Sequence, residues 1–539
     1  MVAIHAQGQG SPLQRFLNEC RINPAVSLQS ELARANQVAM EAFTILKNES
    51  QRPCLTNWII SRVEEGAWSV NIDALNHLCC LEEVAKTCLH QPIEIVGTLL
   101  EEILKNRSLV SCKKQLAKSV PALQDVPDDP ENIREWFANP DNKEVLRKVE
   151  ELDLSGLQLV HVPEEIKYLE KLRRLNLSGN CLQHHSLESL AALQELQSLD
   201  ISACYLEAIP TQHLIKMSAL QYLDLSQNDF KNLSPHALSG ITQVKELVLY
   251  RCSLQKIPKS LKDMSSLQYL DLSGNDSINN IPYNAFEGLQ IVSVDLSDTG
   301  IRLVPSAALR MVKNTLTDLN LSATRIARIA RDAFQELKLR RLNLSNTRMT
   351  TVPSGALQGL QGTLQVLDLS GNEITRQKVG KKAFQNLQLQ ELDLGDMHLT
   401  VIPPETLQSL KSTLQILRLG SNAISHIDDI LFEGFVLEKL DLCDMELEEI
   451  PSKALQEIKE TLKGLDLSGN NIKSLGEGLF AHLKKLETLF LDSLPDNLEI
   501  SDKAFEGLSA LKRLSFSHTK LEEFPWKAIQ GLANLEMIG

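Results

Sequence analysis

The chain has 539 residues, with 55 Lys and Arg against 69 Asp and Glu, and a formal net charge of -14. Hydrophobic residues make up 43% and charged residues 23%, which excludes a mainly disordered chain, a collagen and a small disulfide scaffold. The acidic balance argues against a protein whose main task is gripping nucleic-acid phosphates, so we expect no nucleic acid among its partners.

Residues 1–125 carry no repeat and predict an all-α N-terminal domain. Apolar residues at spacings of three and four indicate helices at 28–48, 55–65, 72–89, 92–106 and 109–118. Residues 126–148 predict a linker, VPDDP at 126–130, and a capping helix carrying Trp136, Phe137, Val145 and Leu146. We expect this helix to cover the open end of the array that follows, because a repeat stack exposes apolar surface at its ends.

Residues 149–539 repeat the pattern L-x-x-L-x-L about sixteen times, for example ELDLS at 151, YLDLS at 222 and VLDLS at 366, at spacings of 23 to 25 residues. Each L-x-L predicts a short strand with its Leu side chains inward, followed by a helical or turn-like stretch. One unit cannot bury its Leu face alone, so neighbours stack. The fold class is therefore α/β, a curved solenoid with a parallel concave sheet and a helical or turn-like convex side. A seventeenth unit stops within its strand at Gly539, so we expect a truncated C-terminal end.

The repeats alternate between two types, which gives a second period of about 48 residues. The residue three after L-x-L is Asn at 180, 228, 275, 372, 422 and 470, and it is Cys204, Cys252, Thr299, Thr347, Met397 or Met445 in the units between. Asn forms a hydrogen-bonded ladder with the backbone of such turns, whereas Cys and Thr do so weakly and Met hardly at all. We therefore expect looser turns at Met397 and Met445.

The repeat resembles the leucine-rich repeat (LRR) family over about 390 residues. This resemblance implies a non-enzymatic scaffold that binds a protein partner on its concave face. The segment rich in Trp, Asn and Pro before Val162-Pro163-Glu164-Glu165-Ile166 also resembles LRR proteins of chlamydia-like intracellular bacteria. That second resemblance implies an effector or host-interaction protein.

The chain start predicts no signal peptide, because residues 1–21 lack a basic start followed by an apolar run. No stretch reaches 18 uninterrupted apolar residues, so we expect no membrane span. Ten Cys without paired spacing indicate free thiols in a reducing cytoplasm. An effector of this kind would reach a host cell by a route independent of a signal peptide.

Two other functions stay open. A ubiquitin ligase component would use the array to choose its substrate, with an F-box before it or a Cys-dependent ligase domain after it. A receptor ectodomain is disfavoured, because it would need a signal peptide and Cys-rich caps.

We expect no enzyme activity, no cofactor and no metal site. His77, Cys79, Cys80, Cys88 and His90 do not show C-x2-C spacing and fit one amphipathic helix. Cys204 and Cys252 lie at the turns, where burial should make them inert. The chain also has no glycine-rich phosphate loop, and an open array has no cleft for acid-base catalysis.

The outward middle position of L-x-L predicts an acidic stripe on the concave face, formed by Asp200, Asp224, Asp271, Asp295, Asp368, Asp393, Asp441 and Asp466. Either the stripe attracts a basic partner, or D-L-S is only the default of the repeat. Departures from that default are the candidate partner-binding residues, since aromatic residues and Arg often anchor interfaces. They are Tyr222, Val248, Tyr250, Arg251 and Tyr269 in one group, Val366, Ile416, Arg418 and Lys439 in a second, and Phe490 near Pro495.

Overall fold

The computed structural model describes residues 93–182, 184–374, 379–496, 498–521 and 523–539. The helices predicted at 28–48, 55–65 and 72–89, and the group from His77 to His90, lie outside these ranges. The chain divides into two compact units. The first comprises Met1–Leu206 and Gln212–Leu220, and the second Glu207–Thr211 and Gln221–Gly539.

The described part of the first unit begins with helices. These are α5 (Ile93–Leu116), η2 (Pro121–Leu123), α6 (Pro130–Ala138), η3 (Pro140–Asn142) and α7 (Lys143–Leu146). The prediction of two helices at 92–106 and 109–118 was wrong, because α5 is continuous: no Gly or Pro interrupts residues 105–110. The predicted capping helix is instead split at Asn139-Pro140, since Pro has no backbone N–H to continue the ladder.

Helix α6 packs against the first repeat of its own unit. Phe137 is buried and stacks on Tyr168 with ring centroids 6.3 Å apart. The Arg134 guanidinium lies 3.3 Å from a carboxylate oxygen of Glu165. These contacts are those expected of a cap; the division at residues 125 and 148 stays a prediction.

Within the described ranges, seventeen short strands form parallel ladders, three in the first unit and fourteen in the second. The first unit has β1 (Glu151–Asp153), β2 (Arg174–Asn176) and β3 (Ser198–Asp200), with η4 (Glu164–Tyr168) and η5 (His184–Ala192) between them. The short helix α8 spans Thr211–Leu214.

The strands of the second unit follow one another in chain order. They are β4 (Tyr222–Asp224), β5 (Glu246–Val248), β6 (Tyr269–Asp271), β7 (Ser293–Asp295), β8 (Asp318–Asn320), β9 (Arg341–Asn343), β10 (Val366–Asp368), β11 (Glu391–Asp393), β12 (Ile416–Arg418), β13 (Lys439–Asp441), β14 (Gly464–Asp466), β16 (Thr488–Phe490), β18 (Arg513–Ser515) and β19 (Met537–Ile538). The register pairs equivalent residues, for example Leu392 with Leu417. A separate small sheet joins β15 (Ser474–Leu475) and β17 (Glu499–Ile500).

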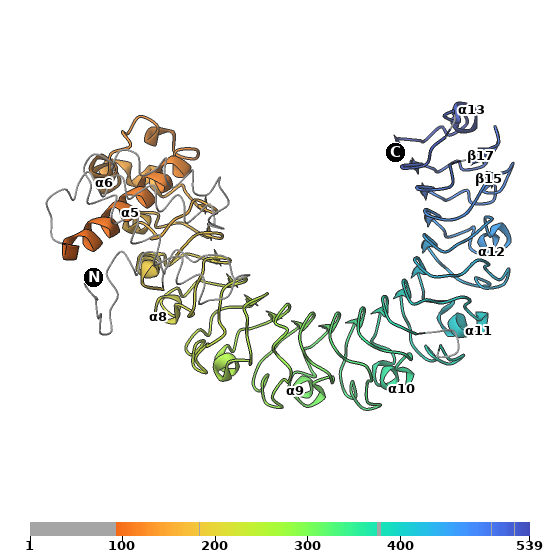
Figure 1. The fold of residues 1–539 in the computed structure, drawn as a ribbon, viewed down its shortest axis with the longest axis horizontal. Coiled ribbons are helices and arrows are strands. Elements are labelled where there is room, and N and C mark those ends of the chain that lie inside the picture. The colour runs from red at the N-terminus through yellow and green to blue at the C-terminus, as the bar shows by residue number, and fades with distance from the viewer. Residues whose placement is uncertain (1–92, 183, 375–378, 497, 522) are drawn as a thin grey trace, which may run out of the picture. The chain divides into compact units, whose positions relative to one another are not determined.

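Within the second unit the strands line the inner edge of a curved stack, and short helices lie on its outer edge (Figure 1). The helical segments are η6 (Lys259–Asp263), α9 (Ser306–Met311), α10 (Ser354–Leu357), η7 (Gln358–Leu360), α11 (Pro404–Leu407), η9 (Gln408–Leu410), α12 (Ser452–Gln456) and α13 (Trp526–Ile529). The predicted solenoid with a parallel sheet is confirmed, while the all-α N-terminal domain stays a prediction. No helix within the described ranges is long and apolar enough to cross a membrane.

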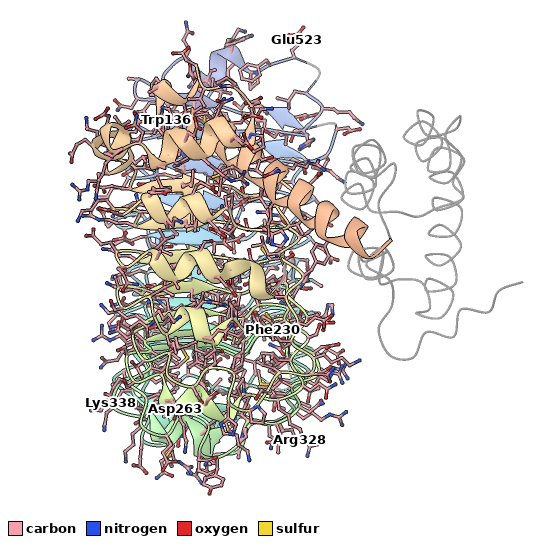
Figure 2. The ribbon with its side chains drawn as sticks, turned by 90° about the vertical axis from the view of Figure 1, so that its left-hand side faces the viewer. Trp136, Phe230, Asp263, Arg328, Lys338 and Glu523 are labelled. Carbon is pink, nitrogen blue, oxygen red and sulfur yellow. The ribbon has the colours of Figure 1, made fainter. Side chains whose placement is uncertain are left out.

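The interior of the second unit is built from the inward Leu side chains and a column of Phe. Leu319 and Leu321 of one strand segment are 2% and 0% exposed. The recurring Phe side chains are fully buried, and the first of them is labelled in Figure 2. They are Phe230, Phe286, Phe334, Phe384, Phe432, Phe480 and Phe505.

The Asn ladder joins each turn to its neighbour. Asn422 Nδ2 donates to the carbonyls of Leu394 (2.8 Å) and Leu419 (2.7 Å), while its Oδ1 accepts the N–H of Met397 at 3.1 Å. The N–H of Met445 likewise donates to Asn470 Oδ1 at 3.1 Å. The prediction of looser turns at both Met residues was therefore wrong. The Asn of the following repeat accepts the backbone N–H of each Met and so fixes the turn, which the Met side chain cannot do.

Candidate functional site

The candidate site is the inner face of the second unit. It consists of the side chains of β4 to β18 that point away from the buried interior. The stripe residues are half-buried, because each is held by its own turn. Asp368 Oδ1 accepts the N–H of Ser370 at 2.9 Å and its hydroxyl at 2.7 Å. Asp200 of the first unit accepts the N–H of Ser202 in the same way. The Asp residues therefore have a structural role in every such repeat.

The stripe is not continuous in the second unit but resolves into three acidic pairs across adjacent strands. Their registers are Asp271 with Asp295, Asp368 with Asp393, and Asp441 with Asp466. The remaining stripe residue, Asp224, faces Val248. Asn320 and Asn343 separate the first two pairs, and Arg418 stands between Asp393 and Asp441.

Proximity of the carboxylates changes their acidity. Burial raises the pKa of Asp271, and the charge of Asp295 raises it further against the opposing hydrogen bonds from Ser273. Burial likewise raises the pKa of Asp393 and of Asp466, each with a contribution from its neighbouring Asp. Like charges on adjacent strands disfavour each other, so a cation placed over a pair would relieve the repulsion.

Two arginines cross the stripe. Arg341 reaches Asp318 at 2.8 Å, and Arg418 pairs with Glu391 while lying 3.9 Å from Asp393. Asn320 Nδ2 donates to Asp295 Oδ2 at 2.8 Å. Sequence reasoning missed Arg341, Asp318 and Glu391, although the same alternation that exposes the third strand residue also exposes the first.

The strands around these residues enclose a shallow hollow of about 310 Å³. Its lining includes two of the predicted residues of the second group, Val366 and Arg418, and Tyr269 of the first. The side chains around it come from β6 to β12 and are Tyr269, Asp295, Asn320, Arg341, Asn343, Val366, Asp368, Glu391, Asp393 and Arg418, among others.

The first predicted group comes together on β4, β5 and β6. Tyr222 and Tyr269 flank Glu246 in register, and Val248 stands between Asp224 and Asp271. The Tyr222 hydroxyl donates to Asp224 Oδ2 at 3.3 Å.

Tyr250 and Arg251 follow β5 and pack on each other, with the guanidinium 5.1 Å from the ring centroid. Both lie across Gly274 of the next repeat, where an added Cβ would meet Arg251 at 2.5 Å. Gly274 also has a φ of +69°, so this close approach requires glycine there.

The other predicted residues lie apart from this cluster. Ile416 and Lys439 are paired in register on β12 and β13, beside the hollow but outside its lining. Phe490 on β16 stands between Asp466 and Ser515 and is half-buried.

Burial makes Cys204 and Cys252, which lie at the turns, poor nucleophiles. Cys204 and Cys252 are fully buried, and burial raises the pKa of both thiols to about 12. Their thiols donate to the carbonyls of Leu177 (3.1 Å) and Leu225 (3.2 Å). Among the described residues no group of three or more His, Cys, Asp or Glu is arranged to hold a metal ion.

The leucine-rich repeat pattern matches residues 147–206, 194–254, 243–301, 314–374, 338–399, 387–442, 435–493 and 497–539. The chain belongs to the leucine-rich repeat family. Members of this family typically bind proteins and are usually non-enzymatic.

Solved LRR structures share the fold. An LRR protein of Leptospira interrogans is 25% identical, with a TM-score of 0.52, over 67% of this chain and 93% of that one. TLR13, in a complex with ssRNA13, is 25% identical with a TM-score of 0.54, over 70% of this chain and 59% of that one.

The curated relatives match only short segments. Mouse vasorin is 35% identical over 91 residues, which are 17% of this chain and 14% of vasorin. Human vasorin is 44% identical over 66 residues, which are 12% of this chain and 10% of vasorin. The relatives named here give no support to a chlamydia-like origin, which stays a prediction.

Proposed function

We propose that this LRR protein is a non-enzymatic scaffold that binds a protein partner across the inner face of its second unit. The observation that carries the proposal is the continuity between the Tyr cluster, defined as Tyr222, Tyr250 and Tyr269, and the hollow that Tyr269 borders. Aromatic side chains backed by Arg251 offer rigid contact area, and polar groups surround them.

The charge of the face supports a basic partner. Three acidic pairs lie along the inner face, and each has one carboxyl whose pKa is raised by burial and by its neighbour. A Lys or Arg of a partner would lower this repulsion and would bring hydrogen-bond donors for the Asp oxygens that face outward.

The test replaces Tyr222, Tyr250 and Tyr269 together with Ala in the full chain. Proteins captured from lysate by the wild type should bind this variant at least about tenfold more weakly, as expected when interface anchors are truncated. Tyr283→Ala is the matched control, because Tyr283 is 71% exposed and lies outside the cluster. Equal capture by wild type, control and triple variant would refute the role of the inner face.

RNA is the second candidate partner, and the likeness to TLR13 in complex with ssRNA13 is the observation that favours it. The acidic pairs of the inner face would repel phosphates, so protein is the stronger candidate. Retarded migration of single-stranded RNA with the full chain at about 0.15 M salt would favour RNA instead.

The wider role remains part of the proposal. A cytoplasmic effector or host-interaction protein is supported by five free cysteines among the described residues, which suit a reducing compartment. A ligase component and a receptor ectodomain are the alternatives. Captured partners that belong to the ubiquitin-conjugation machinery would favour the ligase component. Partners found only outside cells would favour the receptor ectodomain.

A further inference from the structure

A run of unpaired cations lies on one flank of the second unit. Residues 301–355 contain ten Lys and Arg but three Asp and Glu, in a chain whose net charge is -14. All three acids are already paired: Asp318 with Arg341 (2.8 Å), Asp332 with Arg310 (3.4 Å) and Glu336 with Lys313 (2.5 Å).

Four of the remaining cations form the basic flank, which we define as Arg302, Arg325, Arg328 and Arg348. All four are exposed, and none forms an ion pair with another described residue. They belong to the loops that leave β7, β8 and β9, and the loops stack through their backbones. Arg325 N–H donates to Ile301 O at 3.0 Å, and Arg348 N–H donates to Ile326 O at 3.2 Å.

The opposite flank is different. Figure 2 shows Arg328 and Lys338 on opposite sides of the stack. Lys338 belongs to the segment that enters β9, whereas Arg328 follows β8. The basic flank is thus confined to the side where the chain leaves the strands.

The same side carries an acidic flank further along, defined as Asp444, Glu446, Glu448 and Glu449. These residues follow β13, are all exposed, and form no ion pair with another described residue. Asp444 N–H donates to Ser468 O at 2.8 Å, so this loop is stacked on the next repeat as the arginine loops are.

The spacing of the two flanks makes them mutually complementary between two copies. Strands β8 and β13 are five steps apart, about 24 Å at about 4.8 Å per step. When two second units face each other by this side and one is turned by 180° about an axis through the middle of the interval, each basic flank meets the acidic flank of the other copy. The midpoint falls between β10 and β11.

We propose that this side of the second unit binds a second copy of the chain in an antiparallel, two-fold arrangement held by two identical contacts between the basic and acidic flanks. A self-complementary surface of this kind closes into a dimer and does not propagate. Arg on carboxylate gives charge-assisted, bidentate hydrogen bonds, which suits a contact made without an apolar patch. At about 0.15 M ionic strength the Debye length of about 8 Å lets each flank act locally despite the net charge of the molecule.

The experiment measures the mass of the full chain in solution by sedimentation velocity at protein concentrations up to about 100 µM, a range that detects weak association. The wild type should form dimers at about 50 mM salt, and the dimer should weaken at least about tenfold at about 500 mM salt. A wild type that stays monomeric throughout the low-salt series overturns the proposal.

Charge reversals locate the contact. Arg325→Glu, Arg328→Glu and Arg348→Glu together should leave a monomer, and so should Glu446→Lys, Glu448→Lys and Glu449→Lys together. A one-to-one mixture of these two triple variants should restore a dimer, because one carries two acidic flanks and the other two basic flanks. A mixture that stays monomeric, although both variants keep the wild-type circular dichroism, overturns the proposal.

The matched control reverses three cations before the strands, Lys245→Glu, Lys338→Glu and Arg340→Glu, and therefore changes the net charge equally. It should dimerise like the wild type, and loss of the dimer in this control would contradict the assignment. RNA that is bound by a monomeric wild type and released by the arginine variant would assign the basic flank to nucleic acid and overturn the proposal. The Tyr variants of the inner face leave both flanks intact, so the two proposals fail independently.

Discussion

At the scale of single residues, one buried Asn joins two repeats through both ends of its side chain. Asn275 Oδ1 accepts the N–H groups of Cys252 (3.0 Å) and Leu254 (2.9 Å), and its Nδ2 donates to Leu249 O (2.9 Å) and Leu272 O (2.8 Å). It is 1% exposed, so water cannot replace these bonds. The sequence predicted the ladder from the period of the Asn residues, but the direction of the bonds became visible only in the structure.

Asn275→Ala should lower the free energy of unfolding by about 2–4 kcal/mol, because it leaves buried backbone groups without partners. Urea unfolding followed by circular dichroism measures the loss. Asn279→Ala serves as control, since Asn279 is exposed and bonds only Ser277 O within its own loop. A loss below about 0.5 kcal/mol, the range of ordinary surface changes, would show that the ladder is dispensable.

The acidic pairs make the free energy of unfolding depend on pH, and the direction of this dependence follows from the raised pKa of Asp271. Because burial and Asp295 raise the pKa of Asp271, the folded state holds its proton more tightly than the unfolded state. This contribution is fully present below the unfolded pKa of about 3.9 and is lost as pH rises through the higher folded value.

Asp271→Asn should therefore stabilise the protein at neutral pH by about 0.2–1 kcal/mol, with the gain shrinking towards pH 3.5. Asn can keep the turn, since Asn343 Oδ1 accepts the N–H of Ser345 at 2.8 Å at the equivalent position. Urea midpoints of variant and wild type at several pH values test this. A gain that grows as pH falls would contradict the sign.

At the scale of elements, each strand and its following segment form one unit of packing. The alternation of Leu placed the strands of the long parallel ladders correctly, because the inward face of an L-x-L segment has no other place to be buried, but it did not predict the small sheet of β15 and β17. Helix lengths in the first unit were less predictable. The break at Pro140 and the continuity of α5 depend on which backbone N–H groups form hydrogen bonds. The spacing of hydrophobic residues does not indicate which of them do.

Leu321→Asp should cost more than about 3 kcal/mol and unfold neighbouring repeats, because Leu321 is fully buried and a carboxylate there has no partner. Asn320→Asp is the matched control, with the same new charge one residue earlier on the outward face. It should cost no more than about 1 kcal/mol, through repulsion with Asp295. Hydrogen exchange resolves which repeats open, and equal protection in both variants would refute the inward assignment of Leu321.

At the scale of the molecule, charge is distributed unevenly. The inner face of the second unit is acidic, and one flank changes from basic to acidic along the stack. The acidic stripe could be predicted from the repeat, because the Asp positions are periodic. The pairing of Arg418 with Glu391 and the hollow between Tyr269 and Arg418 could not be predicted, because both depend on side chains that reach from one repeat to the next.

If the acidic pairs drive recognition, binding of the captured partner to the inner face should weaken at least about tenfold between about 50 mM and about 500 mM salt. Titration of immobilised full chain with that partner at increasing salt measures the slope. The Tyr283→Ala control should show the same slope as wild type. An affinity independent of salt would leave the Tyr cluster, and not charge, as the source of binding.

The closure of each Met turn by the Asn of the following repeat bears on how such an array changes length. Gain or loss of about 48 residues, which is two repeats, moves the Met backbone N–H and the Asn that accepts it together. The contacts between all other repeats then stay unchanged. A change of about 24 residues would set two Met turns side by side, one of them without its amide. Duplication of two repeats at a time therefore keeps the protein folded at each step.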